Sequence, residues 1–163
     1  MRNTVFMLAA LLLASSCGNS DSDVADVRFV HTSEGAVLTG STLTLTGVDE
    51  KTGWFTDRPV REAGQVDTAG FVRAWGEGPD SFAAFPPKAD FTCAVDGEVI
   101  HRVVELRQAS RDGDELVYEV SAVGNGSADS EIACTGAAHL FVDSKAQKRD
   151  ESGGFTFIRS MAS

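Results

Sequence analysis

The stretch STLTLTGV, residues Ser41–Val48, decides the fold class of this chain. Its threonines and leucines alternate one by one from position 42 to position 46. Because successive side chains of a strand point to opposite faces, this alternation predicts a β-strand with a leucine face on a core and a threonine face outside. A helix would instead need apolar residues every three or four positions. We therefore expect a β-protein.

The same two-residue period appears on both sides of this stretch. It predicts further strands over Asp26–Thr32, Ala89–Val95, Glu98–Ala109, Glu115–Val123, Glu131–Asp143 and Gly154–Ser160. Asp96 and Gly97 separate two of these runs, and RDGD at 111–114 separates the next two, as in tight hairpins. The basic cluster Lys145–Arg149 reads as a solvated loop before the last strand. Short strands joined by turns predict a mainly β fold, an antiparallel β-sandwich or barrel-like domain.

One segment, Asp67–Trp75, departs from this pattern. Phe71, Val72 and Trp75 recur at helical spacing, and either Asp67 or Thr68 before them is a good N-cap residue. Gly76 follows directly and is a common helix stop. We expect one short helix here.

The N-terminus predicts export. Arg2 precedes an uninterrupted apolar run at 5–13, VFMLAALLL, which is too short to cross a bilayer but has the length of a signal-peptide core. The following LASSC resembles the lipobox of a bacterial lipoprotein signal, which makes Cys17 the lipidated first residue of the mature chain. The alternative is ordinary cleavage after Ser16, which would release a soluble secreted protein.

We assign residues 1–16 to a signal peptide, 17–25 to a lipidated flexible tether and 26–163 to a single β-rich domain. The whole chain has 14 basic and 24 acidic residues and a net charge of −10. Loss of residues 1–16 removes one arginine and no acid, so the mature chain would carry −11. Such a surface repels phosphates, which argues against a nucleic-acid partner. The expected location is the bacterial cell envelope, on the periplasmic or the outer surface, held to its membrane through lipid.

The three cysteines support this assignment. If Cys17 carries lipid, Cys93 and Cys134 remain as an even pair, and both lie in predicted strands. An oxidising compartment favours a disulfide between them. Two buried thiols or a redox pair are the alternatives, although the chain has no Cys-x-x-Cys motif.

The stretch WFTDRPVREAG, residues 54–64, concentrates charge beside aromatic residues. It is either a loop that braces itself through its acid and its arginines, or a binding surface on which an arginine receives a carboxylate or another planar anion. The candidate binding surface consists of Trp54, Phe55, Asp57, Arg58, Arg61 and Trp75.

This stretch and the residues after it resemble an uncharacterised family of bacterial exported proteins and lipoproteins. The family pattern is Phe-[Ser/Thr]-Asp-Arg-Pro-x-Arg-x-x-Gly, then Thr-x-x-Phe-Val-x-x-Trp, then Ser-Phe and Pro-Pro-x-Ala. The residues that match it are Phe55, Asp57, Arg58, Pro59, Arg61, Gly64, Thr68, Phe71, Val72, Trp75, Ser81, Phe82, Pro86, Pro87 and Ala89. Thr56 and Lys88 depart from the usual serine and asparagine. The resemblance implies one compact exported β-domain and no particular chemistry.

No catalytic or metal-binding pattern stands out. His31, His101 and His139 are isolated, and the chain has no Gly-x-Ser-x-Gly elbow. We therefore expect no metal or cofactor, and a non-enzymatic binding or assembly module whose partner is an envelope protein or a small ligand. A small periplasmic hydrolase with an unrecognised site is the alternative.

Overall fold

The computed structural model of the protein describes residues 24–58, 60–79, 81–123, 131–148 and 155–161. Its strands are β1 (Val24–Ser33), β2 (Gly35–Thr39), β3 (Thr42–Thr46), β4 (Lys51–Thr56), β5 (Ala63–Asp67), β6 (Lys88–Val95), β7 (Glu98–Asp112), β8 (Glu115–Ala122), β9 (Ile132–Ala133) and β10 (Ala138–Lys148). The helices are α1 (Thr68–Arg73), the 3-10 turn η2 (Ala74–Gly76) and α2 (Thr156–Met161). The prediction of a mainly β, antiparallel fold with a short helix is confirmed.

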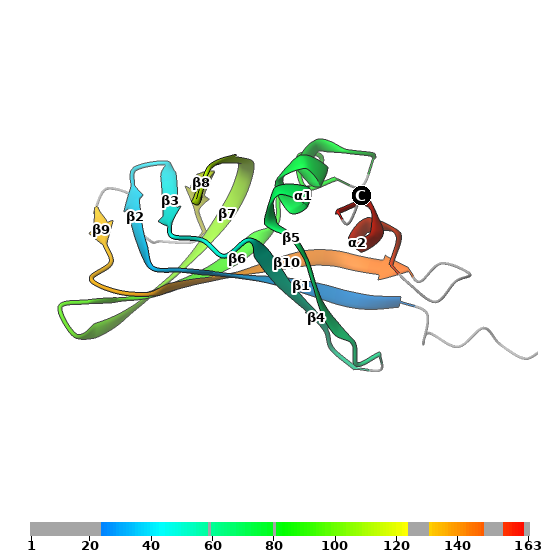
Figure 1. Ribbon diagram of the computed structural model, residues 1–163, viewed down its shortest axis with the longest axis horizontal. Helices are drawn as coiled ribbons and strands as arrows, with labels where there is room; N and C mark the ends of the chain where they lie inside the picture. The colour runs from blue at the N-terminus through cyan, green and yellow to red at the C-terminus, as the bar shows by residue number, and fades with distance from the viewer. Residues whose placement is uncertain (1–23, 59, 80, 124–130, 149–154, 162–163) are drawn as a thin grey trace, which may run out of the picture.

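The strands form one sheet in the order β5-β4-β1-β10-β6-β7-β8-β3-β2-β9, and each pairing is antiparallel. The sheet folds over on itself, so that β2, β3 and β8 lie across from the long strands β1 and β10 (Figure 1). β7 makes the turn, because its first part pairs with β6 and its second part with β8. A bulge between Leu106 and Gln108 marks the change of partner and bends the strand.

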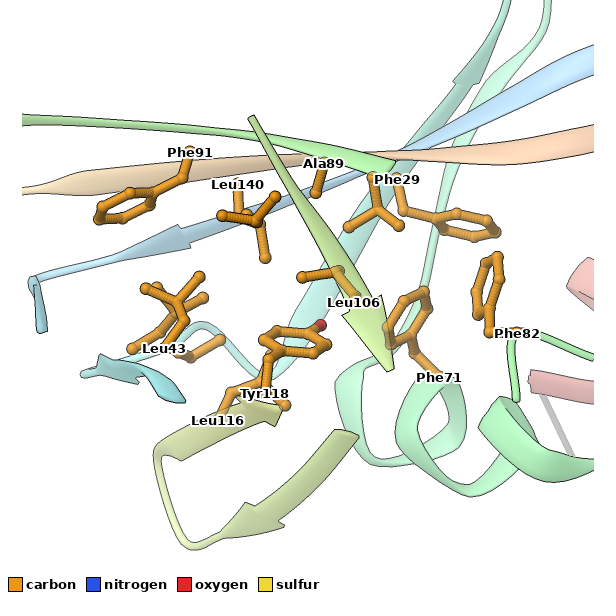
Figure 2. Close-up of a cluster of buried hydrophobic side chains, with 14 of the residues drawn as sticks. Phe29, Leu43, Phe71, Phe82, Ala89, Phe91, Leu106, Leu116, Tyr118 and Leu140 are labelled. Carbon is orange, nitrogen blue, oxygen red and sulfur yellow. The ribbon is translucent and has the colours of Figure 1, made fainter. Parts of the chain in front are cut away.

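The core lies between the two halves of the folded sheet. Figure 2 shows Phe91 and Leu140 on one side, facing Leu43 and Leu116 on the other. All four side chains are fully buried. The leucines of the STLTLTGV stretch point into this core, as their alternation predicts, which gives the domain its sandwich-like architecture.

The helical segment closes the open end of this sandwich. Phe71 of α1 is fully buried and its ring lies 5.1 Å from that of Phe29 and 5.7 Å from that of Phe82 (Figure 2). Tilted ring pairs at this distance add stabilisation beyond the burial of their area. The predicted short helix is confirmed, with Asp67 at its N-cap position but without a side-chain capping bond. Its aromatic residues Phe71 and Trp75 lie in the core rather than on the expected binding surface.

A disulfide joins Cys93 of β6 to Cys134, which follows the two-residue strand β9. The two Cα atoms are 5.8 Å apart. Thr135 supports the same junction, since its backbone N–H donates to the carbonyl oxygen of Ala94 at 2.8 Å. The predicted disulfide is confirmed, and it ties the short edge strand to the centre of the sheet.

Four expectations about the elements were wrong or incomplete. The run Gly154–Ser160 is not a strand, because Thr156–Met161 form α2. Lys145–Lys148 are not a loop but the end of β10, which pairs with the first residues of β1. The run Glu131–Asp143 is divided between β9 and β10, and β2, β4 and β5 were not foreseen.

The predicted signal peptide and Cys17 lie outside the described residues, as does the lipid attachment. The proposed tether overlaps the fold at its end, since Val24 and Ala25 are the first residues of β1. Ala25 is buried there, because its strand pairs with β10.

Candidate functional site

The stretch 54–64 forms the end of a β-hairpin between β4 and β5. Trp54 pairs with Gly64 and Phe55 with Ala63. Because neighbouring strand residues face opposite ways, Trp54 lies on the core-facing side of the sheet, like its cross-strand neighbour Phe29, and Phe55 lies on the outer side. The structure therefore separates the two aromatic residues that the sequence places together.

Thr56 braces the hairpin. Its hydroxyl donates to the carbonyl oxygen of Val60 at 2.9 Å and accepts from the backbone N–H of Glu62 at 2.9 Å. The backbone N–H of Thr56 also donates to the carbonyl oxygen of Glu62 at 2.9 Å. Because Thr56 and Val60 are both buried, these bonds matter: they satisfy the backbone N–H of Thr56, the carbonyl of Val60, and the N–H and carbonyl of Glu62.

The charged residues of the loop contribute less to this bracing than the sequence indicates. Asp57 Oδ1 accepts from the backbone N–H of Arg58 at 2.7 Å. Arg58 and Arg61 are exposed, and neither forms a salt bridge with another described residue. The loop does brace itself, but through a threonine hydroxyl rather than through its arginines.

Trp75 does not share a surface with this loop. Only 4% of its surface is exposed, and its indole Nε1–H donates to the carbonyl oxygen of Arg107 at 3.2 Å. Its ring lies 4.8 Å from that of Phe82 and 5.6 Å from that of Tyr118. Trp75 is a core residue whose one polar atom is satisfied.

Trp54 instead lines a groove between β5 and α2, with a volume of about 360 Å³. The groove is lined by Trp54, Glu62, Gly64, Gln65, Val66, Phe155, Ile158 and Arg159. The rings of Trp54 and Phe155 meet edge to face, with their centroids 6.3 Å apart. A Cβ atom on Gly64 would lie 2.8 Å from the indole, so glycine at 64 allows the ring to lie flat on β5. The arrangement suits an apolar or aromatic group flanked by polar atoms.

A second polar feature is buried completely. His31 Nε2 lies 2.9 Å from the hydroxyl oxygen of Tyr118, and His31 Nδ1 lies 3.2 Å from Oγ1 of Thr52. Thr52 Oγ1 lies 3.0 Å from Oγ1 of Thr68, which donates to the carbonyl oxygen of Asp49 at 2.8 Å. These side chains form one continuous chain of hydrogen bonds between the sheet and the first residue of α1.

The order of donors in this chain follows from its last member. Since the hydroxyl of Thr68 donates to a carbonyl, it accepts from Thr52, and Thr52 in turn accepts from Nδ1–H of His31. Nε2 then carries no proton and accepts from Tyr118. Burial, together with a smaller effect from the positive charge of Arg111, lowers the pKa of His31 from 6.5 to about 3. Burial also raises the pKa of Tyr118. The neutral imidazole is a structural hydrogen-bonding group here.

The other two histidines lie on the outer side of the sheet. His101 Nε2 is 3.2 Å from Oδ1 of Asp90, and His139 Nδ1 is 3.4 Å from the hydroxyl oxygen of Thr32. Both histidines are exposed. Within the described part of the chain, no group of three or more histidine, cysteine or acidic side chains could hold a metal ion. No described helix is long and apolar enough to cross a membrane.

Sequence reasoning missed the groove and the buried hydrogen-bond chain. The groove depends on α2, a helix where the sequence predicts a strand. A signal for the buried histidine was present, because His31 follows Val27 and Phe29 on the apolar side of the β1 alternation. The partners of His31 come from β4, α1 and β8, and their proximity depends on strand order, which the sequence does not state.

Comparisons with protein-family models, with curated proteins and with solved structures found no significant match to this chain. The resemblance to a family of bacterial exported proteins therefore stays a prediction.

Proposed function

We propose that the protein is a lipid-anchored bacterial envelope protein whose β-domain acts as a binding or assembly module. The apolar leader and the lipobox-like sequence before Cys17 support the anchor. The disulfide between Cys93 and Cys134 is consistent with folding in an oxidising compartment. Acyl chains on Cys17 would hold the domain at its membrane without a spanning helix.

The observation that carries the binding role is the groove between β5 and α2. Trp54 is only half-buried there, and an aromatic side chain beside a depression is a frequent anchor in binding sites. Glu62 and Arg159 also line the groove and give it charged side chains. The occupant is an apolar or aromatic group of an envelope protein or of a small ligand.

The buried histidine supports binding over hydrolysis. A general base needs a pKa near the working pH and access to substrate, whereas His31 has a pKa of about 3 and both ring nitrogens bonded within the core. A periplasmic hydrolase would need another base, for example the exposed pair of His101 and Asp90.

The test is a pulldown from detergent-solubilised envelope with three full-length baits: the wild type, Trp54→Ala and Phe141→Ala. Phe141 is 38% exposed on the outer side of β10 and is the matched control for removal of an aromatic ring. We expect the same retained molecules for the wild type and Phe141→Ala, and their loss with Trp54→Ala, with circular dichroism confirming that each bait is folded. Equal retention by all three baits would show that the groove is not the binding site.

A further inference from the structure

A second depression lies between α1 and the hairpin that joins β7 to β8. Its volume is about 420 Å³, and it is lined by Ala69, Val72, Arg73, Arg111 and Gly113. Two arginines thus come together beside the small apolar side chains of one helix. This pocket is separate from the groove at Trp54 and shares no lining residue with it.

Arg111 belongs to the core-facing side of β7. It pairs with Leu116, two residues from the pair formed by Ala109 and Tyr118, and the side chains of Leu116 and Tyr118 are fully buried. Since residues two apart on a strand share a face, the arginine points to the same side as this core. Its side chain is half-buried, and its charge reaches His31, whose pKa it helps to lower.

The guanidinium of Arg111 is held but not neutralised. Its Nε donates to the carbonyl oxygen of Gly113 at 2.7 Å, which fixes the plane of the group. Among the described residues it forms no salt bridge, although Asp112, Asp114 and Glu115 belong to the same hairpin. The described salt bridges of the other cations lie elsewhere, for example Arg107 with Glu105 at 2.8 Å.

This arrangement is unexpected for an acidic chain. With 24 acidic residues against 14 basic ones, a half-buried cation would readily find a carboxylate of its own. Arginine can bury its stem while its charged end stays in water. The bond from Arg111 Nε to Gly113 is exposed, so the guanidinium is accessible to an incoming anion. A planar guanidinium with a fixed orientation is suited to a carboxylate, which it holds through two parallel hydrogen bonds.

We propose that this pocket binds the carboxylate of a small amphiphilic molecule. Arg111 receives the carboxylate, and Ala69 and Val72 contact a short apolar tail. Arg73, whose charge also acts on Asp67, lines the same pocket. The apolar wall favours an organic carboxylate over an inorganic anion such as phosphate. The proposal does not depend on the lipid anchor or on the groove at Trp54.

The test is a titration of the full-length protein with hexanoate, followed by NMR through the backbone amide signals of Val72 and Gly113. Hexanamide, which has the same shape without the charge, and inorganic phosphate are titrated in parallel. We expect saturable shifts with hexanoate alone. This comparison uses the unaltered protein, so it stands even if a variant fails to fold. Absence of saturation with hexanoate, equal binding of hexanamide, or binding of phosphate alone would overturn the proposal.

Variants then locate the site. Arg111→Gln is expected to weaken hexanoate binding roughly tenfold or more, and Arg111→Lys to weaken it less, because the lysine keeps the charge but loses the two-pronged geometry. Arg102→Gln is the matched control, since Arg102 is an exposed arginine of the same strand that does not line the pocket. Equal affinity of Arg111→Gln and Arg102→Gln for hexanoate would contradict the assignment.

Discussion

At the scale of single residues, His31 shows how this core accommodates polar atoms. Both ring nitrogens are bonded, one to Tyr118 and one to Thr52, and the ring packs edge to face on Phe71 at 4.8 Å. A buried polar group costs little when its hydrogen bonds are made and about 1–3 kcal/mol when one is lost. The imidazole is therefore stable where it is as long as it stays neutral.

This requirement makes the stability of the protein depend on pH. The pKa of His31 is 6.5 in the unfolded chain and about 3 in the folded one, so between these values the unfolded state binds a proton that the folded state does not. The contribution of His31 is complete above pH 6.5. It falls by about 1.4 kcal/mol per pH unit as the pH drops from 6.5 towards 3.

Urea unfolding at a series of pH values between 7 and 4 measures this slope. The variant His31→Gln keeps a donor and an acceptor but does not titrate, and the carboxylates common to both proteins cancel in the comparison. We expect the free energy of unfolding to fall more steeply with acid in the wild type than in the variant. Parallel curves would show that His31 is protonated in the folded state.

Gly70 offers a second test at this scale. A Cβ atom at this position would lie 1.9 Å from the carbonyl oxygen of Met161, so α1 and α2 approach each other through the missing side chain. Helix propensity alone predicts that Gly70→Ala stabilises α1 by about 1 kcal/mol. We expect instead a loss of about 1–3 kcal/mol in thermal or chemical unfolding, because the backbone of α2 must move.

The control is Gly76→Ala, since no heavy atom lies within 4 Å of the Cβ position of Gly76. This change should leave the free energy of unfolding within about 0.5 kcal/mol of the wild type. Stabilisation by Gly70→Ala would mean that α2 does not pack on α1 as described.

At the scale of elements, the loop of the β4–β5 hairpin can be stabilised either by the hydroxyl of Thr56 or by its arginines, and two variants distinguish these explanations. Thr56→Val removes a hydroxyl that bonds the buried carbonyl of Val60 and the partly buried N–H of Glu62, and it leaves both backbone groups without this partner. We expect a loss of about 1–3 kcal/mol in chemical unfolding. Arg58→Ala, which removes an exposed side chain of the same loop, should change stability by no more than about 0.5 kcal/mol. A larger loss of stability with Arg58→Ala than with Thr56→Val would instead support a loop that is braced by its arginines.

The elements also show what the sequence could predict. β3 and the hairpins around Asp96 and Gly113 were foreseen, because alternation and turn residues are local signals. β4 and β5 were missed because glycines and charged residues interrupt their alternation, and their stability comes from pairing with β1 and with each other. α2 was mistaken for a strand because its six residues carry an apolar pattern too short to fix a period. Its place depends on tertiary contacts with Gly70 and Trp54.

The candidate site also depends on tertiary contacts that local sequence signals do not show. Trp54, a member of the expected binding surface, lines a groove, but the groove residues Phe155 and Ile158 lie about a hundred residues further along the chain. The sequence puts Trp75 on the expected binding surface, whereas it lies in the core. Helical spacing shows which face of the helix Trp75 belongs to, but it does not show whether the rest of the fold covers that face. The pocket at Arg111 was not foreseen, since only the fold brings α1 over the β7–β8 hairpin.

At the scale of the whole molecule, the disulfide ties the edge of the sheet to its centre. Cys93 and Cys134 enclose a sequence separation of 41 residues, and a crosslink of this span stabilises a domain by about 4 kcal/mol through the unfolded state. The double variant Cys93→Ala/Cys134→Ala should lose about that much in guanidinium unfolding under oxidising conditions. A variant as stable as the wild type would show that β9 and its neighbours hold without the crosslink.

For the whole molecule we propose that this acidic β-domain folds outside the cytosol and is tied to a membrane by Cys17, its first mature residue. The most direct measurement is the intact mass of the protein from the membrane fraction, taken without reduction. We predict a chain that begins at Cys17, carries acyl groups on that residue, and is two hydrogens lighter because Cys93 and Cys134 are joined. A cytosolic product that begins at Met1 and has all its thiols reduced would contradict the account.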